Sequence, residues 1–431
     1  NPLQQIERFN QQLAYYAYVK HDVGRTHAIA AQVQTLAETH QLPAAIVSAL
    51  RAEGDTLVHQ TLIEQALPLY DRAYTLAQTI PNNEAQTMKV ARQLIRAKTE
   101  LGQATAEVEQ LLNWLVETAE QRQDPLELGM AYGERGVYYF NFSHYQQVAA
   151  DFEQALTYYR LAGALKEEAA TVSNLGIVRW ALLEYGQAID NMMAGLTLYR
   201  QHHNRRGELY SYNGLAELYL QIGQWHKAEQ MLTAGLPLAA QLHSHGITVF
   251  LLRSQVVLLI EQGNLVEAQT AVTQMETLIT QLTAPYPQSV TAIAQGEMLM
   301  TQERWLEAAA RFELARQKCE AAQRFWSLPL ILTQLAYVLW RTGQQTEAQR
   351  WSSAAVEAHQ TYQSDYGVLV FWHHYQITGD FEWLEQAHKL YIKQRKGLPQ
   401  ETAWLAAFDQ IKLHRQLTAA WADQRPIVRT V

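Results

Sequence analysis

The sequence predicts an all-α fold, a right-handed superhelix of about ten helix pairs with a C-terminal capping helix. Small residues recur at a step of 40 (176−136 and 216−176), at Gly136, Gly176 and Ala216. A large apolar residue follows each of them sixteen positions later (152−136), at Phe152, Met192 and Leu232. No stretch of strand length alternates apolar and polar residues between turn signals. A fixed period of this length indicates stacked helical repeats, because small residues let two helices approach and large ones fill the groove between them.

The first third of the chain follows this pattern less strictly. We expect helices up to about residue 20 and over 24–40, then a pair built on Gly54 and Ala66 in which Pro68 kinks the second helix. A third pair should span about 84–102 and 104–123. The loose register at the start is typical of an end repeat.

The best-formed repeats span 126–365. We expect a loop over 282–288, where Pro285 and Pro287 stand, yet the register resumes unshifted at Gly296. We therefore predict one continuous solenoid over 1–424. Its last pair covers about 367–378 and 381–396, and a single helix over 401–423 caps the last repeat. Residues 425–431 should form a disordered tail.

Composition excludes several classes of protein. A net charge of −8 and a pI near 6 argue against a nucleic-acid surface, which would need a basic face. The single cysteine, Cys319, excludes an internal disulfide framework and a cysteine-rich zinc site. No apolar run reaches the roughly 18–20 residues of a membrane span. We expect a cytoplasmic protein.

Motifs of catalysis are absent from the sequence, so we predict no enzyme, no cofactor and no metal. It has no phosphate loop of Walker type, no H-E-x-x-H and no G-x-S-x-G. His373 and His374 are adjacent, and adjacent side chains on a helix point about 100° apart, so they do not face one ion together.

Two segments resemble a known repeat family. Residues Ser173-Asn174-Leu175-Gly176 and Glu184-Tyr185-Gly186-Gln187-Ala188 resemble the tetratricopeptide repeat (TPR). The linker 204–208 and the following Asn213-Gly214-Leu215-Ala216-Glu217-Leu218-Tyr219 resemble the long repeats of MalT-type regulators. This resemblance implies the sensor region of a bacterial signal-transduction ATPase, which binds an inducer or a protein. An ATPase module and a helix-turn-helix segment are not recognisable in this chain, and would lie outside it.

The concave face is the predicted binding surface. Aligning the first helices on their small residues places one set of side chains inward: Asn174, Trp180, Tyr210, Asn213, Glu217, Arg253, Tyr337 and Trp340. For Asn174 and Asn213, a purely structural role is as good an interpretation as a binding role, with their polar side chains satisfied within the helix stack. For the aromatic residues, packing between repeats is the stronger alternative. An inward Arg253 should need an anionic partner, such as an acidic side chain or a terminal carboxylate of a bound peptide.

The sequence as a whole favours a non-enzymatic scaffold that binds a peptide or protein on its concave face, as the sensor or interaction region of a bacterial signalling protein. Two alternatives stay open. One is a small-molecule inducer-binding domain of a transcriptional regulator, and the other is a free-standing assembly adaptor. We predict no direct contact with nucleic acid or membrane, and the sequence predicts no oligomeric state.

Overall fold

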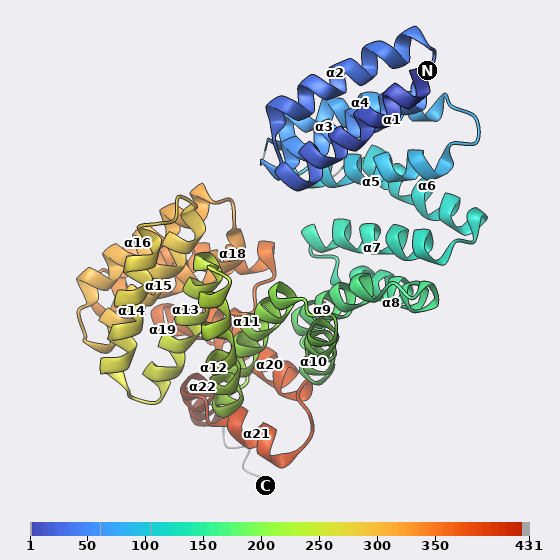
Figure 1. Ribbon diagram of the computed structural model, residues 1–431. Coiled ribbons are helices and arrows are strands. Elements are labelled where there is room, and N and C mark those ends of the chain that lie inside the picture. The colour runs from blue at the N-terminus through green and yellow to red at the C-terminus, as the bar shows by residue number, and fades with distance from the viewer. Residues whose placement is uncertain (1, 61, 104, 425–431) are drawn as a thin grey trace. The chain divides into compact units, whose positions relative to one another are not determined.

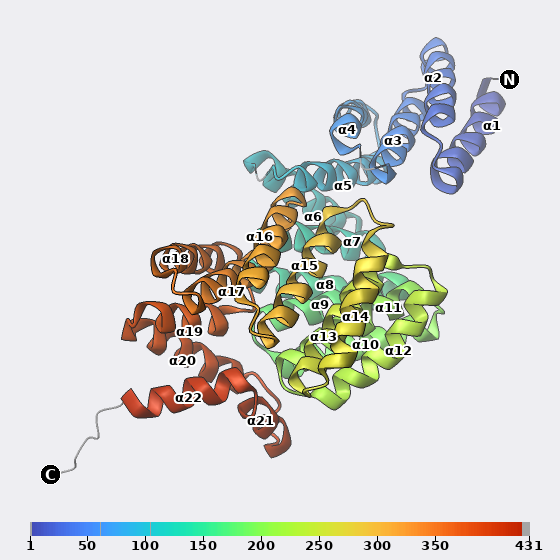
Figure 2. The ribbon, with the colours of Figure 1, turned by 90° about the vertical axis from the view of Figure 1, so that its left-hand side faces the viewer.

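The computed structural model describes residues 2–60, 62–103 and 105–424, and the regular structure within these ranges is helical throughout. It contains twenty-two α-helices in the described residues, arranged as successive antiparallel pairs (Figures 1 and 2). The all-α prediction of about ten pairs is confirmed. The predicted tail, 425–431, lies outside the described residues.

The chain divides into two compact units, Asn1–Ala164 and Leu165–Val431, which we call the N-terminal and C-terminal units. The continuity of one solenoid over 1–424 stays a prediction. The predicted loop at 282–288 is no boundary between units, because it lies inside the C-terminal unit, where helices on either side of it pack together.

The N-terminal unit contains four helix pairs. Their bounds are α1 Pro2–Tyr15 with a π-helical turn Tyr16–Lys20, α2 Val23–Thr39, α3 Pro43–His59, α4 Ile63–Gln78, α5 Glu84–Glu100, α6 Ala106–Arg122, α7 Pro125–Asn141 and α8 Tyr145–Ala162. Local chemistry explains several starts. The carboxylate of Asp124 accepts the N–H groups of Leu126 and Glu127, and Pro125 occupies the first helical position, where its missing N–H costs nothing.

The C-terminal unit contains six pairs and two further helices. Their bounds are α9 Leu165–Ala181, α10 Tyr185–Gln201, α11 Arg205–Gln221, α12 Trp225–Gln241, α13 His245–Glu261, α14 Leu265–Ile279, α15 Pro285–Thr301, α16 Trp305–Ala321, α17 Leu328–Arg341, α18 Gln345–Tyr362, α19 Gly367–Thr378, α20 Phe381–Lys396, α21 Thr402–Asp409 and α22 Lys412–Gln424. Successive first helices begin at 165, 205, 245 and 285, which confirms the 40-residue step.

Small and large residues pack within each pair as predicted. A Cβ atom placed on Gly136 would lie 2.6 Å from the ring of Phe152, and one on Gly176 would lie 2.6 Å from Met192. Only glycine fits such an approach, since a side chain would overlap the neighbouring helix. Leu232, the large residue of the next repeat, is 3% exposed. The register read from the sequence is therefore correct.

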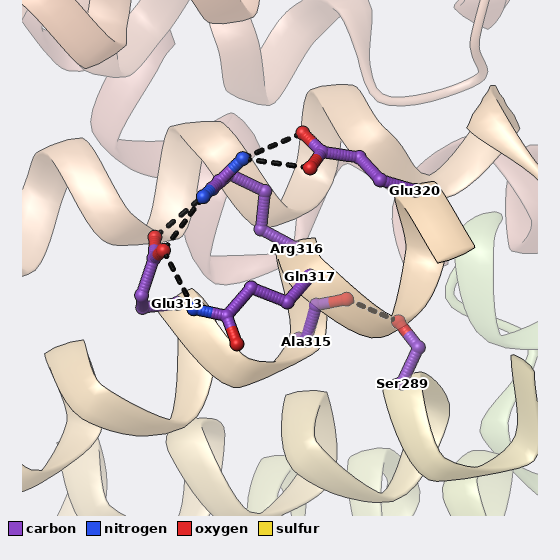
Figure 3. A network of polar contacts seen from close by, with 6 residues as sticks. All are labelled: Ser289, Glu313, Ala315, Arg316, Gln317 and Glu320. Carbon is purple, nitrogen blue, oxygen red and sulfur yellow. Dashed lines mark hydrogen bonds and ion pairs between the residues drawn. The ribbon is translucent and has the colours of Figure 1, made fainter. Parts of the chain in front are cut away.

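The two helices of a pair are also joined by polar contacts. The buried hydroxyl of Ser289 on α15 donates to the carbonyl oxygen of Ala315 on α16, at 2.7 Å (Figure 3). Within α16 itself, Arg316 bonds to Glu313 one turn before it and to Glu320 one turn after it (Figure 3).

The first helices α9, α11, α13 and α15 pack against one another in sequence, as do α17 and α19. We call these the inner helices.

Two predicted boundaries are wrong. The segment 282–288 is not all loop, because α15 begins at Pro285. Proline is tolerated in the first turn of a helix, so Pro285 and Pro287 mark a start and not a break. The cap predicted over 401–423 is two helices, α21 and α22, which are interrupted at Gln410 and Ile411. The break lets both Phe408 and Leu417 be buried in one core.

The end of the C-terminal unit packs back on its beginning. The N–H of Gly186, in the first turn of α10, donates to the carbonyl oxygen of Gly397 after α20, at 3.2 Å. The ammonium group of Lys227 on α12 lies 3.8 Å from the ring centre of Trp404 on α21. One hydrophobic core includes residues of α9 to α13 and of α19 to α22. We call this contact between the two ends of the unit the seam. The cap therefore covers the first repeats of the unit as well as the last.

Candidate functional site

A charged row crosses three neighbouring inner helices of the C-terminal unit. It consists of Asn213 and Glu217 on α11, Arg253 on α13 and Glu297 on α15. An Nη2–H group of Arg253 donates to Oε1 of Glu297 at 2.7 Å, and the two side chains are 18% and 15% exposed. The anion that Arg253 needs is therefore supplied within the chain. The expectation that a bound partner would supply it is wrong.

Sequence reasoning missed Glu297, although a signal for it existed. Glu297 follows Gly296, the small residue of its repeat, as Glu217 follows Ala216. The two glutamates therefore occupy equivalent inward positions two repeats apart. Extending the alignment to this repeat would have found it.

Carboxylates dominate the electrostatics of this inner face. Burial raises the pKa of Glu217 and of Glu297, and Arg253 opposes both shifts. Burial, together with the nearby Glu217, raises the pKa of Asp365, which lies just before α19, to about 7. Burial and Glu217 also raise the pKa of the Tyr366 hydroxyl. Arg253 thus acts on Glu217, Glu297 and Tyr366, whereas Asp365 is influenced by Glu217.

Several buried polar atoms of the inner helices have no hydrogen-bond partner among the described residues. They include Asn213 Oδ1, Glu297 Oε2, Gln334 Oε1, His373 Nδ1 and Gln376 Oε1. They come from α11, α15, α17 and α19. Buried polar atoms in folded proteins are nearly always hydrogen-bonded, so these require water or a ligand.

Asn174 and Tyr210 lie outside the charged row. Asn174, on α9, is exposed, and Tyr210, on α11, is 62% exposed. No hydrogen bond connects either side chain to the row within the described ranges. Both are accessible to a partner, and neither contributes to the electrostatics described above.

Trp180 belongs to the seam. Its indole N–H donates to Oε1 of Gln221, whose amide group donates in turn to the carbonyl oxygen of Asp365 at 3.4 Å. Trp180 is buried in the core shared with α19 to α22. Its geometry agrees with the packing interpretation.

Tyr337 and Trp340 form an aromatic group on α17. The ring of Tyr337 stacks on His373 of α19 with centres 4.4 Å apart, and it lies 5.8 Å from Trp340. Burial lowers the pKa of His373 to about 3, so its ring is neutral. The adjacent His374 bonds instead to Ser352 at 2.6 Å. The two histidines face different surroundings, as their helical spacing predicts.

The described residues contain neither a cluster of metal ligands nor a membrane-spanning helix. In the parts of the chain that the structure describes, no three His, Cys, Asp or Glu side chains gather as metal ligands would. Within the same ranges, no helix is long and apolar enough to cross a membrane.

Comparisons with known proteins agree with a repeat fold. Residues 170–373 match the family described as the Suppressor of spindle checkpoint defect 1 C-terminal domain. No curated protein matches the sequence.

Similar solved structures cover more of the chain. One is a Signal Transduction ATPase with Numerous Domains (STAND) protein with a tetratricopeptide repeat sensor, from Pyrococcus horikoshii, with a TM-score of 0.58 and 16% identity over 77% of this chain. This chain spans about half of that protein, 49% of its length. The apo form of the quorum sensor NprR from B. thuringiensis has a TM-score of 0.56 and 12% identity, over 83% of this chain and 99% of NprR. The apo form of RapI has a TM-score of 0.50 and 10% identity, over 64% of this chain and 98% of RapI. The fold is thus a TPR-like helical superhelix.

Proposed function

We propose that this chain is a non-enzymatic scaffold that binds a peptide or protein on the inner face of its C-terminal unit. One observation carries the proposal: the unpartnered buried polar atoms on α11, α15, α17 and α19. Four of these five atoms are oxygens that accept hydrogen bonds, and the regularly spaced N–H groups of a bound chain would donate to them repeat by repeat. The eight residues predicted from the sequence remain candidates, and Glu297 is added to them.

The size of the row fits a short extended segment. Asn213, Arg253 and Glu297 stand on three inner helices, and packed helices lie about 8–10 Å apart. Two such steps span roughly 16–20 Å, which an extended chain covers with about five or six residues.

The charge of the row favours a basic partner. Arg253 is already paired with Glu297 and also acts on Glu217, and Glu217 in turn acts on a further carboxyl group, that of Asp365. A Lys or Arg side chain, or an amino terminus, would gain from this field. An acidic group of the partner, as first expected for Arg253, would be repelled.

We further propose that the scaffold is the cytoplasmic sensor or interaction region of a bacterial signalling protein. This rests on the fold alone, which a STAND protein and the quorum sensor NprR share. The free-standing adaptor remains the alternative, and the coding sequence next to this one would separate the two.

Selection of hexapeptides against the full chain, followed by calorimetry, tests the proposal. We expect the selected peptides to carry Lys or Arg, and Glu217→Gln to weaken their binding by about 1–3 kcal/mol, as for a lost charged hydrogen bond. Glu357→Gln is the matched control, because Glu357 is an exposed carboxylate on the outer helix α18. Equal affinity in the wild type, Glu217→Gln and an Asn213→Ala variant would move the site off this face.

A further inference from the structure

A small cavity of about 220 Å³ lies at the seam of the C-terminal unit. Its walls come from the turn after α9, from the end of α18 with the loop that follows, and from α19 and α20. The side chains that matter for its chemistry are Leu183, Asp365, Phe371, Leu390, Lys393 and Gln394. The cavity is distinct from the Arg253–Glu297 pair.

Gln394 is a polar group that lines this cavity. The residue is only 4% exposed, and its side-chain amide makes no hydrogen bond to any described residue. It offers one acceptor and two donors to a molecule in the cavity.

Asp365 is the second polar group of the cavity. Its backbone carbonyl accepts from Gln221, but its carboxyl group has no hydrogen bond or ion pair within the described ranges. The groups that act on it are Glu217 on α11 and Tyr185 on α10, whose fully buried hydroxyl also lacks a partner. Neither supplies positive charge, so the carboxylate lacks a cation.

The remaining walls complete a simple pattern. Lys393 is exposed and lines the cavity, which places a positive charge at its open side. Leu183, Phe371 and Leu390 form an apolar wall. His359 and Ser364 bond to each other at 3.1 Å and so satisfy one another. The cavity thus offers an anion inside, a cation at the rim, an amide and an apolar surface.

We propose that this cavity binds a free amino acid of about the size of leucine. Its ammonium group pairs with Asp365, its carboxylate interacts with Lys393 and Gln394, and its side chain packs on the apolar wall. A volume of about 220 Å³ equals about seven water molecules at liquid density, which suits a molecule of this size. The walls come from both sides of the seam, so a bound amino acid also holds the two ends of the unit together.

Calorimetry and thermal unfolding of the full chain test this with three probes of similar shape. L-leucine carries both charges, isoamylamine lacks the carboxylate, and isovalerate lacks the ammonium group and one carbon. We expect L-leucine to bind and to raise the unfolding midpoint, isoamylamine to bind about tenfold more weakly, and isovalerate not to bind. Asp365→Asn should weaken L-leucine about 10- to 100-fold, as for a lost charged hydrogen bond. In Lys393→Ala, the preference for L-leucine over isoamylamine should shrink, with only Gln394 left to contact the carboxylate.

Glu357→Gln is again the control and should bind L-leucine as the wild type does. Circular dichroism checks that the variants fold, which we expect, since Asp365→Asn removes an unpaired charge. The proposal is wrong if L-leucine binding survives Asp365→Asn unchanged, or if isovalerate binds as well as L-leucine. It is also wrong if isoamylamine equals L-leucine in the wild type, or if none of the standard amino acids binds at about 10 mM.

Discussion

The seam makes a testable prediction at Gly397. A Cβ atom on Gly397 would overlap the backbone carbonyl oxygen of Leu183, and Gly397 itself accepts the N–H of Gly186. The φ angle of Gly397 is −77°, which any residue adopts, so Gly397→Ala acts through space alone. The atoms that this Cβ would meet belong to the backbone of Leu183, which cannot rotate away as a flexible side chain can.

The expected cost follows from these contacts. Overpacking of a close contact costs about 1–3 kcal/mol, and loss of the Gly186 hydrogen bond adds about 0.5–1.5 kcal/mol. Opening of the seam limits the sum, since the C-terminal helices can move away from α10. We therefore expect Gly397→Ala to lower the free energy of unfolding by about 1.5–4 kcal/mol.

Hydrogen exchange read by mass spectrometry, together with thermal unfolding, measures this effect. Exchange should rise in α20 to α22 and around 183–190, and stay unchanged in α14 to α16. Gly246→Ala is the control, because a Cβ there meets nothing within 4 Å and the residue lies in helix α13. Alanine should be neutral or slightly stabilising at that site. Equal effects of the two substitutions, or unchanged exchange in α20 to α22, would refute the seam.

Three further predictions concern the core and the charged groups. Leu232→Ala should cost about 2–5 kcal/mol by denaturant unfolding, because Leu232 is fully packed between repeats; an unchanged midpoint would mean a different register. Arg253→Met should lower the free energy of unfolding by about 1–3 kcal/mol, because it leaves Glu297 unpaired. Adding Glu297→Leu to this variant should restore most of the loss. A double variant as unstable as the single one would contradict this. Because the pKa of Asp365 rises from 3.8 to about 7 in the folded chain, its stabilising effect is complete below about pH 4 and is lost as the pH rises through 7. Such a shift corresponds to on the order of 4 kcal/mol, which partial exposure reduces to about 1–3 kcal/mol. Asp365→Asn should therefore flatten the fall in unfolding free energy between pH 4 and 8, and equal slopes in both proteins would exclude this role.

Much of the fold could be predicted from the sequence, because the signals that carry it are local. The pairing of Gly136 with Phe152 and of Gly176 with Met192 joins residues sixteen positions apart. The last pair was predicted at 367–378 and 381–396, which are the bounds of α19 and α20. Such contacts repeat in every pair, so the pattern of small and large residues reports them directly.

The candidate site was predicted in part. Template positions predicted an inward direction for Glu217 and Arg253, since the azimuth of a position on successive helices follows from the period alone. They did not give partners or exposure. Arg253 is paired with Glu297, and Tyr210 is mostly exposed, because both outcomes depend on which neighbouring side chains fill the space.

Tertiary structure alone decided the seam. Gln221 and Asp365 stand 144 positions apart, and Leu183 meets Gly397 across 214 positions (397−183). Such contacts depend on small rotations between repeats that accumulate over several pairs, and no local pattern encodes their sum. The amino-acid cavity at Asp365 and Gln394 exists only because the two ends of the unit meet, so the sequence by itself determined the repeats, and their closure determined the site.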